Sequence, residues 1–345
     1  MNKKEINKLN FILTIVILII LIIIAYFLTK PLLPSIIMAI ILAYICHPIY
    51  KKALKILKNK SLTSFIICIL FILIFGFVLW FGTKALSDQA LEFYRNVRDY
   101  NLIEKISDFL TSSIVKNPEM AGYIASTIKI GLLSMGRKIQ EIAVGFISNI
   151  FWFFLQLFVT FFLMFYFLRD GDKIAEEIYN LLPFKEEIKR RIKIRTSEVT
   201  KGVLYGRVLI GIIQGITAGI GYYIFGIKHP LLFTVLSILF AILPFVGAWL
   251  VWIPLSINFI IIAGWQLGIL HLLYHLIITN QIDNIISPYI VGRTAKIHGG
   301  IALVGMVGGM ISFGLIGLIV GPLILEYLFI AIDIYRKYYL KQNVS

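Results

Sequence analysis

Four polar residues, Asn280, Asp283, Asn284 and Ser287, recur at helical spacing within the sequence TNQIDNIISP (279–288). With 100° of rotation per residue, an α-helix would place all four on one stripe about 100° wide. The stripe should face protein or water rather than lipid, because an ionised carboxylate at membrane depth costs about 2.5 kcal/mol or more. Asp283 therefore requires a compensating cation, proton, polar substrate or arginine.

Two interpretations of this stripe remain open. In one, Asp283 lies at the cytoplasmic end of its helix, where water solvates it and the stripe caps the helix before Pro288. In the other, the stripe lines a cavity at which broken helices converge, and backbone carbonyls and half-helix ends complete a site. Further buried polar groups would contribute hydrogen bonds, a proton or a counter-charge. The predicted substrate or ion path comprises Arg207, Gln214, Asn280, Gln281, Asp283, Asn284, Ser287 and Glu326.

Motifs for enzymatic chemistry are missing from the sequence. His271 and His275 have the i,i+4 spacing of a metal-binding helix, but no Glu follows the HExxH pattern and no third ligand is evident, so no zinc site is predicted. The sequence has no GxSxG and no GxxxxGK motif, which argues against a hydrolase or an ATP-driven pump. We expect no catalytic residue, cofactor, metal or disulfide between Cys46 and Cys68.

The composition indicates an integral membrane protein. Of the 345 residues 59% are hydrophobic and 15% are charged, and the mean hydropathy is +0.90. Charge-free runs at 11–29, 31–50, 61–83, 142–168 and 208–227 each approach or exceed the ~20 residues that a spanning helix needs. We therefore predict an all-α polytopic fold with six full spans and two re-entrant hairpins, or alternatively eight spans.

Two longer apolar runs must be interrupted. Residues 229–282 and 297–325 contain no Asp, Glu, Lys or Arg. A single helix over 230–264 would be about 50 Å long, against a hydrocarbon core of about 30 Å. Proline removes a helical amide, and glycine permits unusual backbone angles. The predicted hairpin tips, which would act as gates, are Pro244 and Gly247 in the first run and Gly314, Gly317, Gly321 and Pro322 in the second.

The basic residues lie mainly on one side of the predicted membrane. With the N-terminus in the cytoplasm, 23 of the 33 Lys and Arg residues fall in cytoplasmic segments, as the positive-inside rule expects. If both long apolar runs form hairpins, Arg293 and Lys296 also lie on the cytoplasmic side. The net charge of +15 is thus explained by loops facing anionic lipid rather than nucleic acid. We expect a cell-membrane protein with both termini cytoplasmic.

The predicted organisation has six parts. They are N-terminal membrane helices (1–83) with a hairpin turn at Lys30 and Pro31, an extracytoplasmic amphipathic helical segment (84–141), a fourth span (142–168), a charged cytoplasmic helical segment (169–203), a membrane transport region (204–335) and a cytoplasmic tail (336–345). Within the transport region, a helix plus hairpin (204–264) precedes a second such unit (267–335) of opposite orientation. Inverted repeats of this kind occur in secondary transporters.

Three stretches resemble the autoinducer-2 exporter family of membrane transporters: HPLLFTVLSILFAILPFVGAWLVWIP, NQIDNIISPYIVGR and GGMISFGLIGLIVGPLIL. The matching residues are Pro244, Gly247 and Pro254, then Gln281, Asn284 and Pro288, then Gly314, Gly317, Gly321 and Pro322. One departure is KIHG, where the family often has His-Pro. The resemblance implies a multi-pass permease and a homo-oligomer, in a family that includes exporters of the signalling molecule and sodium/proton antiporters.

These features favour a secondary transporter that moves a small polar solute or a monovalent cation by alternating access. Asp283 and Asn284 would lie on the path, and the glycine and proline tips would act as gates. Two alternatives from other classes are a channel-like oligomeric pore without a coupled ion and a structural or regulatory membrane protein whose outer segment binds partners.

Overall fold

The computed structural model describes residues 3–99, 107, 111, 117–131, 134, 149–243, 247–282, 285 and 299–336. Within these residues the secondary structure is helical and contains no strand, so the all-α prediction is confirmed. The elements are α1 (Lys3–Thr29), η1 (Lys30–Leu32), α2 (Leu33–Leu57), α3 (Lys60–Asp99), α6 (Ile150–Leu181), α7 (Glu186–Ile224), α8 (Pro230–Ile242), α9 (Trp249–Ala263), α10 (Trp265–Tyr274), η2 (His275–Thr279), α12 (Gly299–Phe313), η3 (Gly314–Ile316) and α13 (Gly317–Tyr335).

Helices long and apolar enough to cross a membrane occur five times in the described residues. They cover Phe11–Leu57, Lys60–Phe77, Phe151–Leu181, Glu186–Ile224 and Gly299–Tyr335. Shorter apolar helices cover Pro230–Ile242, Trp249–Ile260 and Trp265–Thr279. This set of long apolar helices is that of a multi-pass membrane protein.

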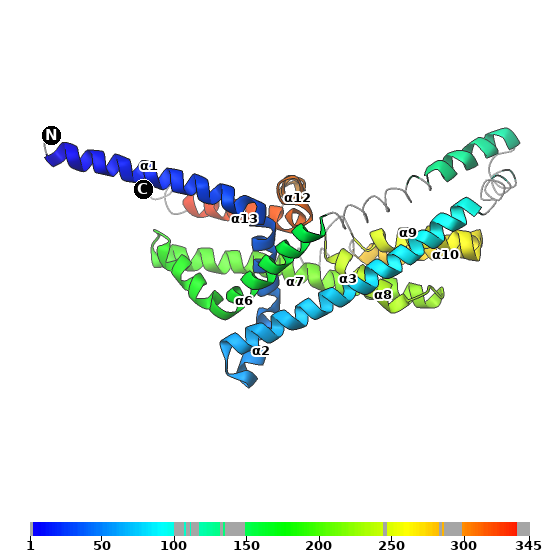
Figure 1. Cartoon of the computed structure of the whole chain (residues 1–345), viewed down its shortest axis with the longest axis horizontal. Coiled ribbons are helices and arrows are strands. Elements are labelled where there is room, and N and C mark those ends of the chain that lie inside the picture. The colour runs from blue at the N-terminus through cyan, green and yellow to red at the C-terminus, as the bar shows by residue number, and fades with distance from the viewer. Residues whose placement is uncertain are drawn as a thin grey trace.

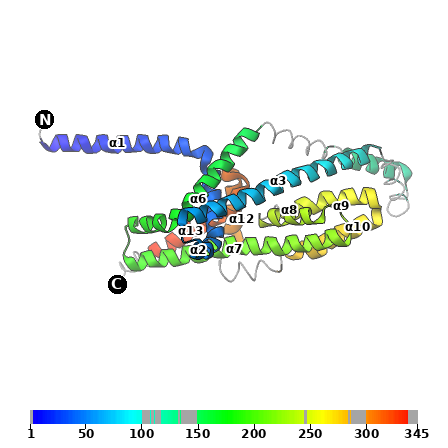
Figure 2. The same cartoon turned by 60° about the horizontal axis from the view of Figure 1, so that its bottom comes forward.

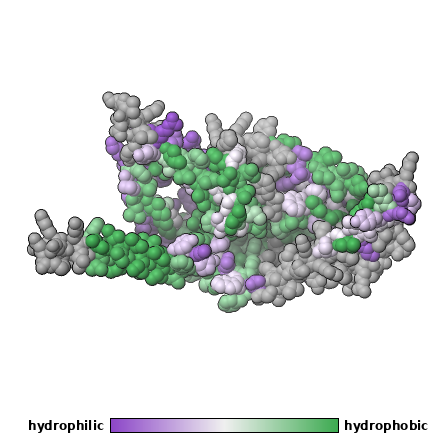
Figure 3. Space-filling view, turned by 90° about the horizontal axis from the view of Figure 1, so that it is seen from above, coloured by the Kyte–Doolittle hydropathy of each residue, from purple (hydrophilic) through white to green (hydrophobic). Residues whose placement is uncertain are grey.

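The N-terminal helix α1 projects away from the rest of the molecule (Figures 1 and 2). Its residues 11–29 are all exposed, and the arm that they form in Figure 3 is hydrophobic. The predicted hairpin at Lys30 and Pro31 is wrong, because the chain bends there through the 3₁₀ turn η1 and continues into α2 without folding back on α1. Proline fits the first turn of a helix, where its missing N–H has no partner to lose, so helical structure can resume at once.

An N-terminal bundle is formed by α2, α3 and α6. Its core contains Cys46 and Cys68, which are buried free thiols, together with Phe161, Met164 and Leu168. The helices α3 and α6 are longer than the spans predicted there. Helix α3 continues as one helix to Asp99, so the segment predicted to begin at 84 starts as an extension of the span.

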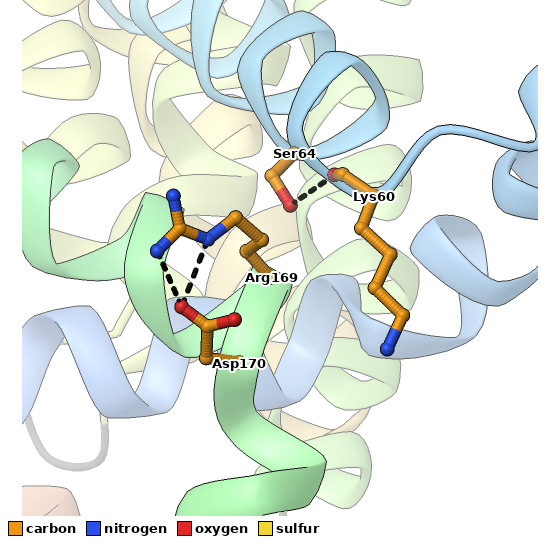
Figure 4. Close-up of polar contacts among 4 residues, drawn as sticks. All are labelled: Lys60, Ser64, Arg169 and Asp170. Carbon is orange, nitrogen blue, oxygen red and sulfur yellow. Dashed lines mark hydrogen bonds and ion pairs between the residues drawn. The ribbon is translucent and has the colours of Figure 1, made fainter.

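A layer of charged and polar groups lies where the apolar parts of α2, α3 and α6 end. Arg169 donates two hydrogen bonds to Asp170 Oδ2, from Nε at 2.8 Å and Nη2 at 2.6 Å (Figure 4). The guanidinium also lies 4.7 Å from the ring centroid of Tyr166. On the neighbouring α3, the Ser64 hydroxyl donates to the Lys60 carbonyl at 3.0 Å (Figure 4). This layer lies at the start of the predicted cytoplasmic segment.

The predicted cytoplasmic segment 169–203 consists of the ends of two long helices. Helix α6 continues to Leu181, a short turn follows, and α7 runs from Glu186 to Ile224 without interruption. Helix α7 is the central helix of the C-terminal part, and it packs against both α8 and α13. At about 1.5 Å per residue, α7 is nearly 60 Å long.

Glycines bring α7 and α8 into close contact. Gly211, Gly215 and Gly219 recur every four residues and face Ile242, Ile238 and Thr234 of the antiparallel α8. A Cβ at Gly211 would lie 2.7 Å from Ile242 Cγ1, and those at the other two glycines would be closer still to their neighbours. Small residues at this spacing permit backbone approach and van der Waals packing between membrane helices.

The first long apolar run breaks where the sequence predicts. Helices α8 and α9, of 13 and 15 residues, are each about 20 Å long, and α8 ends at Ile242 whereas α9 begins at Trp249. Gly247 occupies the left-handed region, with φ +56°. Pro244 lies outside the described residues. A second reversal at Gly264, with φ +94°, lets α10 pack antiparallel to α9.

The second long run folds into a tight hairpin of α12 and α13. Its turn is η3, in which Gly314 has φ +65°. Of the other predicted tip residues, Gly317 directly follows η3 as the first residue of α13, and Gly321 and Pro322 lie about one turn further along; all three are buried and line the contact with α12. Gly305 and Gly309 face them, and the two backbones approach so closely that a methyl group at either position would meet backbone atoms.

Candidate functional site

A buried histidine pair lies where α10 and η2 contact α7 and α9. His271 and His275 are both 0% exposed. Four residues separate them, so a helix presents both side chains on one face. In Figure 2, α7, α9 and α10 run alongside one another in the C-terminal part of the molecule. The pair lies at the contact between these helices, with ring contacts from Tyr222 of α7, from Phe225 directly after α7, and from Trp252 of α9.

The two imidazoles belong to a continuous chain of hydrogen bonds. Ser256 Oγ of α9 lies 2.7 Å from His271 Nδ1. The two Nε2 atoms of His271 and His275 lie 3.2 Å apart. His275 Nδ1 lies 3.0 Å from Thr279 Oγ1. Every ring nitrogen of the pair thus has a partner, as buried polar groups require.

One set of hydrogen-bond directions satisfies every group of this chain. With the single hydrogen of the Ser256 hydroxyl on the Trp252 carbonyl, 2.7 Å away, that hydroxyl accepts a hydrogen bond from His271 Nδ1. A neutral imidazole has one donor and one acceptor nitrogen. His271 Nε2 therefore accepts from His275 Nε2–H, and His275 Nδ1 accepts from the Thr279 hydroxyl. In this arrangement all donors point toward the Trp252 carbonyl.

Aromatic rings enclose the pair. The Trp252 indole stacks on His275 with a centroid distance of 5.4 Å and an interplanar angle of 8°. Tyr222 lies 5.2 Å from His275, and Phe225 lies 5.0 Å from His271. The Tyr222 hydroxyl is hydrogen-bonded to Ser237 Oγ at 2.8 Å, so it is satisfied without either histidine. These rings separate the imidazoles from solvent and lipid.

A π-helical turn positions Thr279, the last residue of this chain of hydrogen bonds. The turn covers His275–Thr279, and the Asn280 N–H donates to the His275 carbonyl at 2.8 Å, five residues back. Gly221 of α7 makes room for this turn, because a Cβ there would meet the Tyr274 ring and would lie 3.1 Å from His275 Cε1. Short π-helical segments are rare and occur frequently at functional sites.

Comparison with known proteins identifies the family. The sequence profile of the family described as AI-2E family transporter matches residues 15–337, which is nearly the whole chain. The chain belongs to this family. The resemblance seen in the sequence is thereby confirmed, and the protein is a multi-pass membrane transporter.

Relatives of this AI-2E family transporter support the same conclusion. A protein of Aquifex aeolicus is 25% identical over 88% of this chain and 90% of its own length. A protein of Methanocaldococcus jannaschii is 28% identical over 82% of this chain and 84% of its own length. Both carry the name "Putative transport protein".

The predicted polar stripe of the transporter is described only in part. Asn280 is half-buried and Gln281 is exposed, and both follow directly on the π-helical turn. Asp283, Asn284 and Ser287 lie outside the described residues. The polar stripe therefore starts next to Thr279, the last residue of the chain of hydrogen bonds that includes the two histidines.

The other predicted path residues of the transporter lie along α7 and α13. Gln214 is buried on α7, two turns before Tyr222, or about 12 Å along the axis. Arg207 is half-buried and lies about 22 Å along α7 from Tyr222, so the structure does not bring it to the histidines. Glu326 is half-buried on α13 beside Tyr327, whose hydroxyl contacts Thr200 Oγ1 at 2.6 Å, near the other end of α7.

Sequence reasoning considered the histidines only as zinc ligands and missed their neighbours. The signal was present in part, because His271, His275 and Thr279 recur every four residues. No signal pointed to Ser256 or Trp252, since their contacts depend on how α9 packs against α10. The described residues contain no group of three or more His, Cys, Asp and Glu side chains placed to hold a metal ion.

Proposed function

We propose that this transporter is a secondary active permease. It exports or exchanges a small polar solute, such as an autoinducer-2-like molecule, or exchanges Na⁺ for H⁺, by alternating access. The observation that best supports this proposal is the pair of broken apolar runs. One turns at Gly247 and the other at Gly314, and helices from both pack against the long α7.

Broken helices have a physical meaning inside a membrane. A turn leaves backbone N–H and C=O groups without helical partners, and such groups are tolerated at membrane depth only within protein or beside water. The dipoles of the two half-helices also end there, which favours ions and polar solutes. Two such breaks around one central helix suit a carrier whose hairpins move against α7.

The proposed path includes the polar stripe after the π-helical turn. Asn280, Gln281, Asp283, Asn284 and Ser287 supply amide, hydroxyl and carboxylate oxygens, which suit a monovalent cation or a polyhydroxylated solute. Asp283 is the one acid in this set. Neutralising it should remove coupled transport if the carboxylate carries or balances the moving charge.

The test uses purified transporter in proteoliposomes that contain a pH-sensitive dye. Imposed Na⁺ and pH gradients, and counterflow of labelled autoinducer-2, are compared for wild type and Asp283→Asn. We expect Asp283→Asn to abolish coupled flux while the thermal unfolding temperature stays unchanged. Asp172→Asn is the matched control, because this side chain is 79% exposed on α6 and lies outside the proposed path. Wild-type flux from Asp283→Asn would refute the role of this residue.

The same assay separates a carrier from a pore. A carrier accelerates uptake when substrate is present on the far side, because the loaded site returns faster than the empty one. A channel-like oligomer shows no such acceleration, and that result would replace the carrier mechanism. Transport retained after trimming residues 84–141 would count against the alternative of a structural or regulatory membrane protein whose outer segment binds partners.

The proposed topology places both termini in the cytoplasm of a cell-membrane protein that forms homo-oligomers in lipid. Labelling of Lys296→Cys checks this arrangement, because both native thiols, Cys46 and Cys68, are buried. We expect membrane-impermeant reagent to reach position 296 from the cytoplasmic side. Reaction from the outside alone would contradict the double-hairpin arrangement. Light scattering of the purified protein gives the oligomer mass.

A further inference from the structure

The hydrogen-bonded residues Ser256, His271, His275 and Thr279 form what we call the histidine chain. One end of this chain cannot pass on a proton and is called the closed end, and the other can and is called the open end. At the closed end, the Ser256 hydroxyl hydrogen is held by the Trp252 carbonyl, which accepts but cannot pass on a proton. At the open end, Thr279 can rotate its hydroxyl, because a Ser or Thr hydroxyl both donates and accepts. The open end adjoins the half-buried Asn280. Thr279 itself is buried, so a proton would join the chain from this side when water reaches it past Asn280.

We propose that His271 and His275 together bind one proton, and that this proton is the coupling ion of the transporter. The second half of the proposal rests on the secondary active function argued above. The site is formed by two imidazoles whose Nε2 atoms lie 3.2 Å apart and whose Nδ1 atoms are each held by a hydroxyl.

The proton balance is simple. In the neutral chain, His275 Nδ1 accepts the hydrogen of the Thr279 hydroxyl. When hydronium reaches Thr279, the hydroxyl passes this hydrogen to Nδ1 and takes a hydrogen from hydronium in its place, which leaves water. The Thr279 oxygen then accepts a hydrogen bond from Nδ1–H. The hydrogen between the two Nε2 atoms now links an imidazolium to an imidazole, so both rings share the charge. Release to water reverses these steps.

Burial disfavours a charge on the pair, and the groups that would stabilise a shared charge of +1 are the aromatic rings around it. The aromatic faces of Trp252 and Tyr222 contact the His275 ring, and such faces attract cations. The titratable groups that face the pair are Tyr222 from α7 and Tyr274 from α10, and their hydroxyls are bonded to Ser237 and to the Thr217 carbonyl. Helix α9 contributes Ser256 and Trp252. Among the described residues, no Asp, Glu, Lys or Arg makes a ring contact or hydrogen bond with either histidine.

The same geometry limits the site to one proton. Two imidazolium rings with adjoining Nε2–H groups would repel each other, and neither nitrogen could accept the other's hydrogen. Closely coupled groups of this kind titrate as a pair rather than as two separate residues. Binding of this single proton would change whether water can reach Thr279 at the open end. Proton movement would in this way be coupled to the exchange of a solute.

The direct test is nitrogen NMR of transporter labelled with ¹⁵N-histidine in lipid nanodiscs. The chain has five histidines, so His47→Gln, His229→Gln and His298→Gln together leave only the pair. As pH falls, we expect the ring nitrogens of both residues to shift in one shared step. The spectra at high pH should show the two neutral tautomers given by the hydrogen-bond direction. A pair that stays neutral until the protein unfolds would overturn the proposal, and so would two independent titrations.

Transport provides the second arm, in which His271→Gln and His275→Gln are compared with His229→Gln, an exposed histidine outside the site. We expect both pair variants to lose flux driven by a pH gradient while retaining counterflow of labelled solute. His229→Gln should retain both. Wild-type pH-driven flux in the pair variants would overturn the coupling role, whereas failure of Asp283→Asn to change transport would overturn the proposed path and leave the NMR result standing. Thr279→Val should slow pH-driven flux, and unchanged rates would contradict entry at this end.

Discussion

The N-terminal bundle and the α7–α10 region bury polar side chains in different ways. In the bundle, the hydroxyl of Thr63 donates to the Asn59 carbonyl four residues earlier. In the C-terminal region, Ser256 makes the same kind of bond to Trp252 and is also bonded to His271 of another helix. A hydroxyl satisfied within its own helix needs nothing from its neighbours, whereas a bond between helices leaves a buried group unpaired if either partner is lost.

The two regions also differ in packing. The bundle is filled by large side chains, such as Phe161, Met164 and Leu168. The α7–α8 and α12–α13 contacts instead use glycines that bring backbones together. Glycine contacts exclude any added atom, whereas side-chain contacts can adjust their rotamers. The C-terminal region is therefore the part in which geometry is most tightly specified, and it is also the part that contains the proposed site.

The largest expected effect comes from Gly309→Ala in α12. A methyl group there would meet the Gly317 backbone, which cannot move aside as a side chain can, so we expect a loss of about 3 kcal/mol in the free energy of unfolding. The neighbouring Gly308 has nothing within 4 Å of the added atom, and Gly308→Ala should be neutral or slightly stabilising. Thermal unfolding in detergent measures both. Equal effects of the two substitutions would contradict the close hairpin.

A smaller effect is expected from Ser256→Ala, for which Thr63→Val is the matched comparison. Both residues are 0% exposed. Removing the Ser256 hydroxyl leaves His271 Nδ1–H without its acceptor, at a cost of about 2 kcal/mol. Removing the Thr63 hydroxyl leaves the Asn59 carbonyl, which still accepts the Thr63 N–H at 3.0 Å, and should cost about 0.5 kcal/mol. Similar losses from both would remove the distinction between the two regions.

The smallest expected effect is that of Tyr222→Phe. Its hydroxyl bonds Ser237 between α7 and α8, so its loss should lower stability by about 1 kcal/mol. The Tyr44 hydroxyl of α2 is buried and has no hydrogen-bond partner among the described residues. Tyr44→Phe should therefore leave the unfolding temperature unchanged or raise it. A larger loss from Tyr44→Phe than from Tyr222→Phe would reverse the comparison.

Local sequence features predicted much of the fold and little of the site. The breaks at Gly247 and Gly314 were predictable, because an apolar run longer than the membrane must turn where glycine allows positive φ. The reversal expected at Lys30 was not found, because a proline in a first helical turn redirects a helix as readily as it ends one. The direction of the chain after such a turn depends on which surface the next helix packs against.

The amino-acid sequence by itself determined that this protein is helical, spans a membrane and belongs to a transporter family. Those properties follow from hydropathy, from charge placement and from motifs that are read along one stretch of chain. Only the tertiary structure decided that Ser256, His271, His275 and Thr279 form one hydrogen-bonded line. The reason is physical: Ser256 reaches His271 because α10 folds back on α9, and Thr279 reaches His275 through a π-helical turn that only packing around Gly221 reveals.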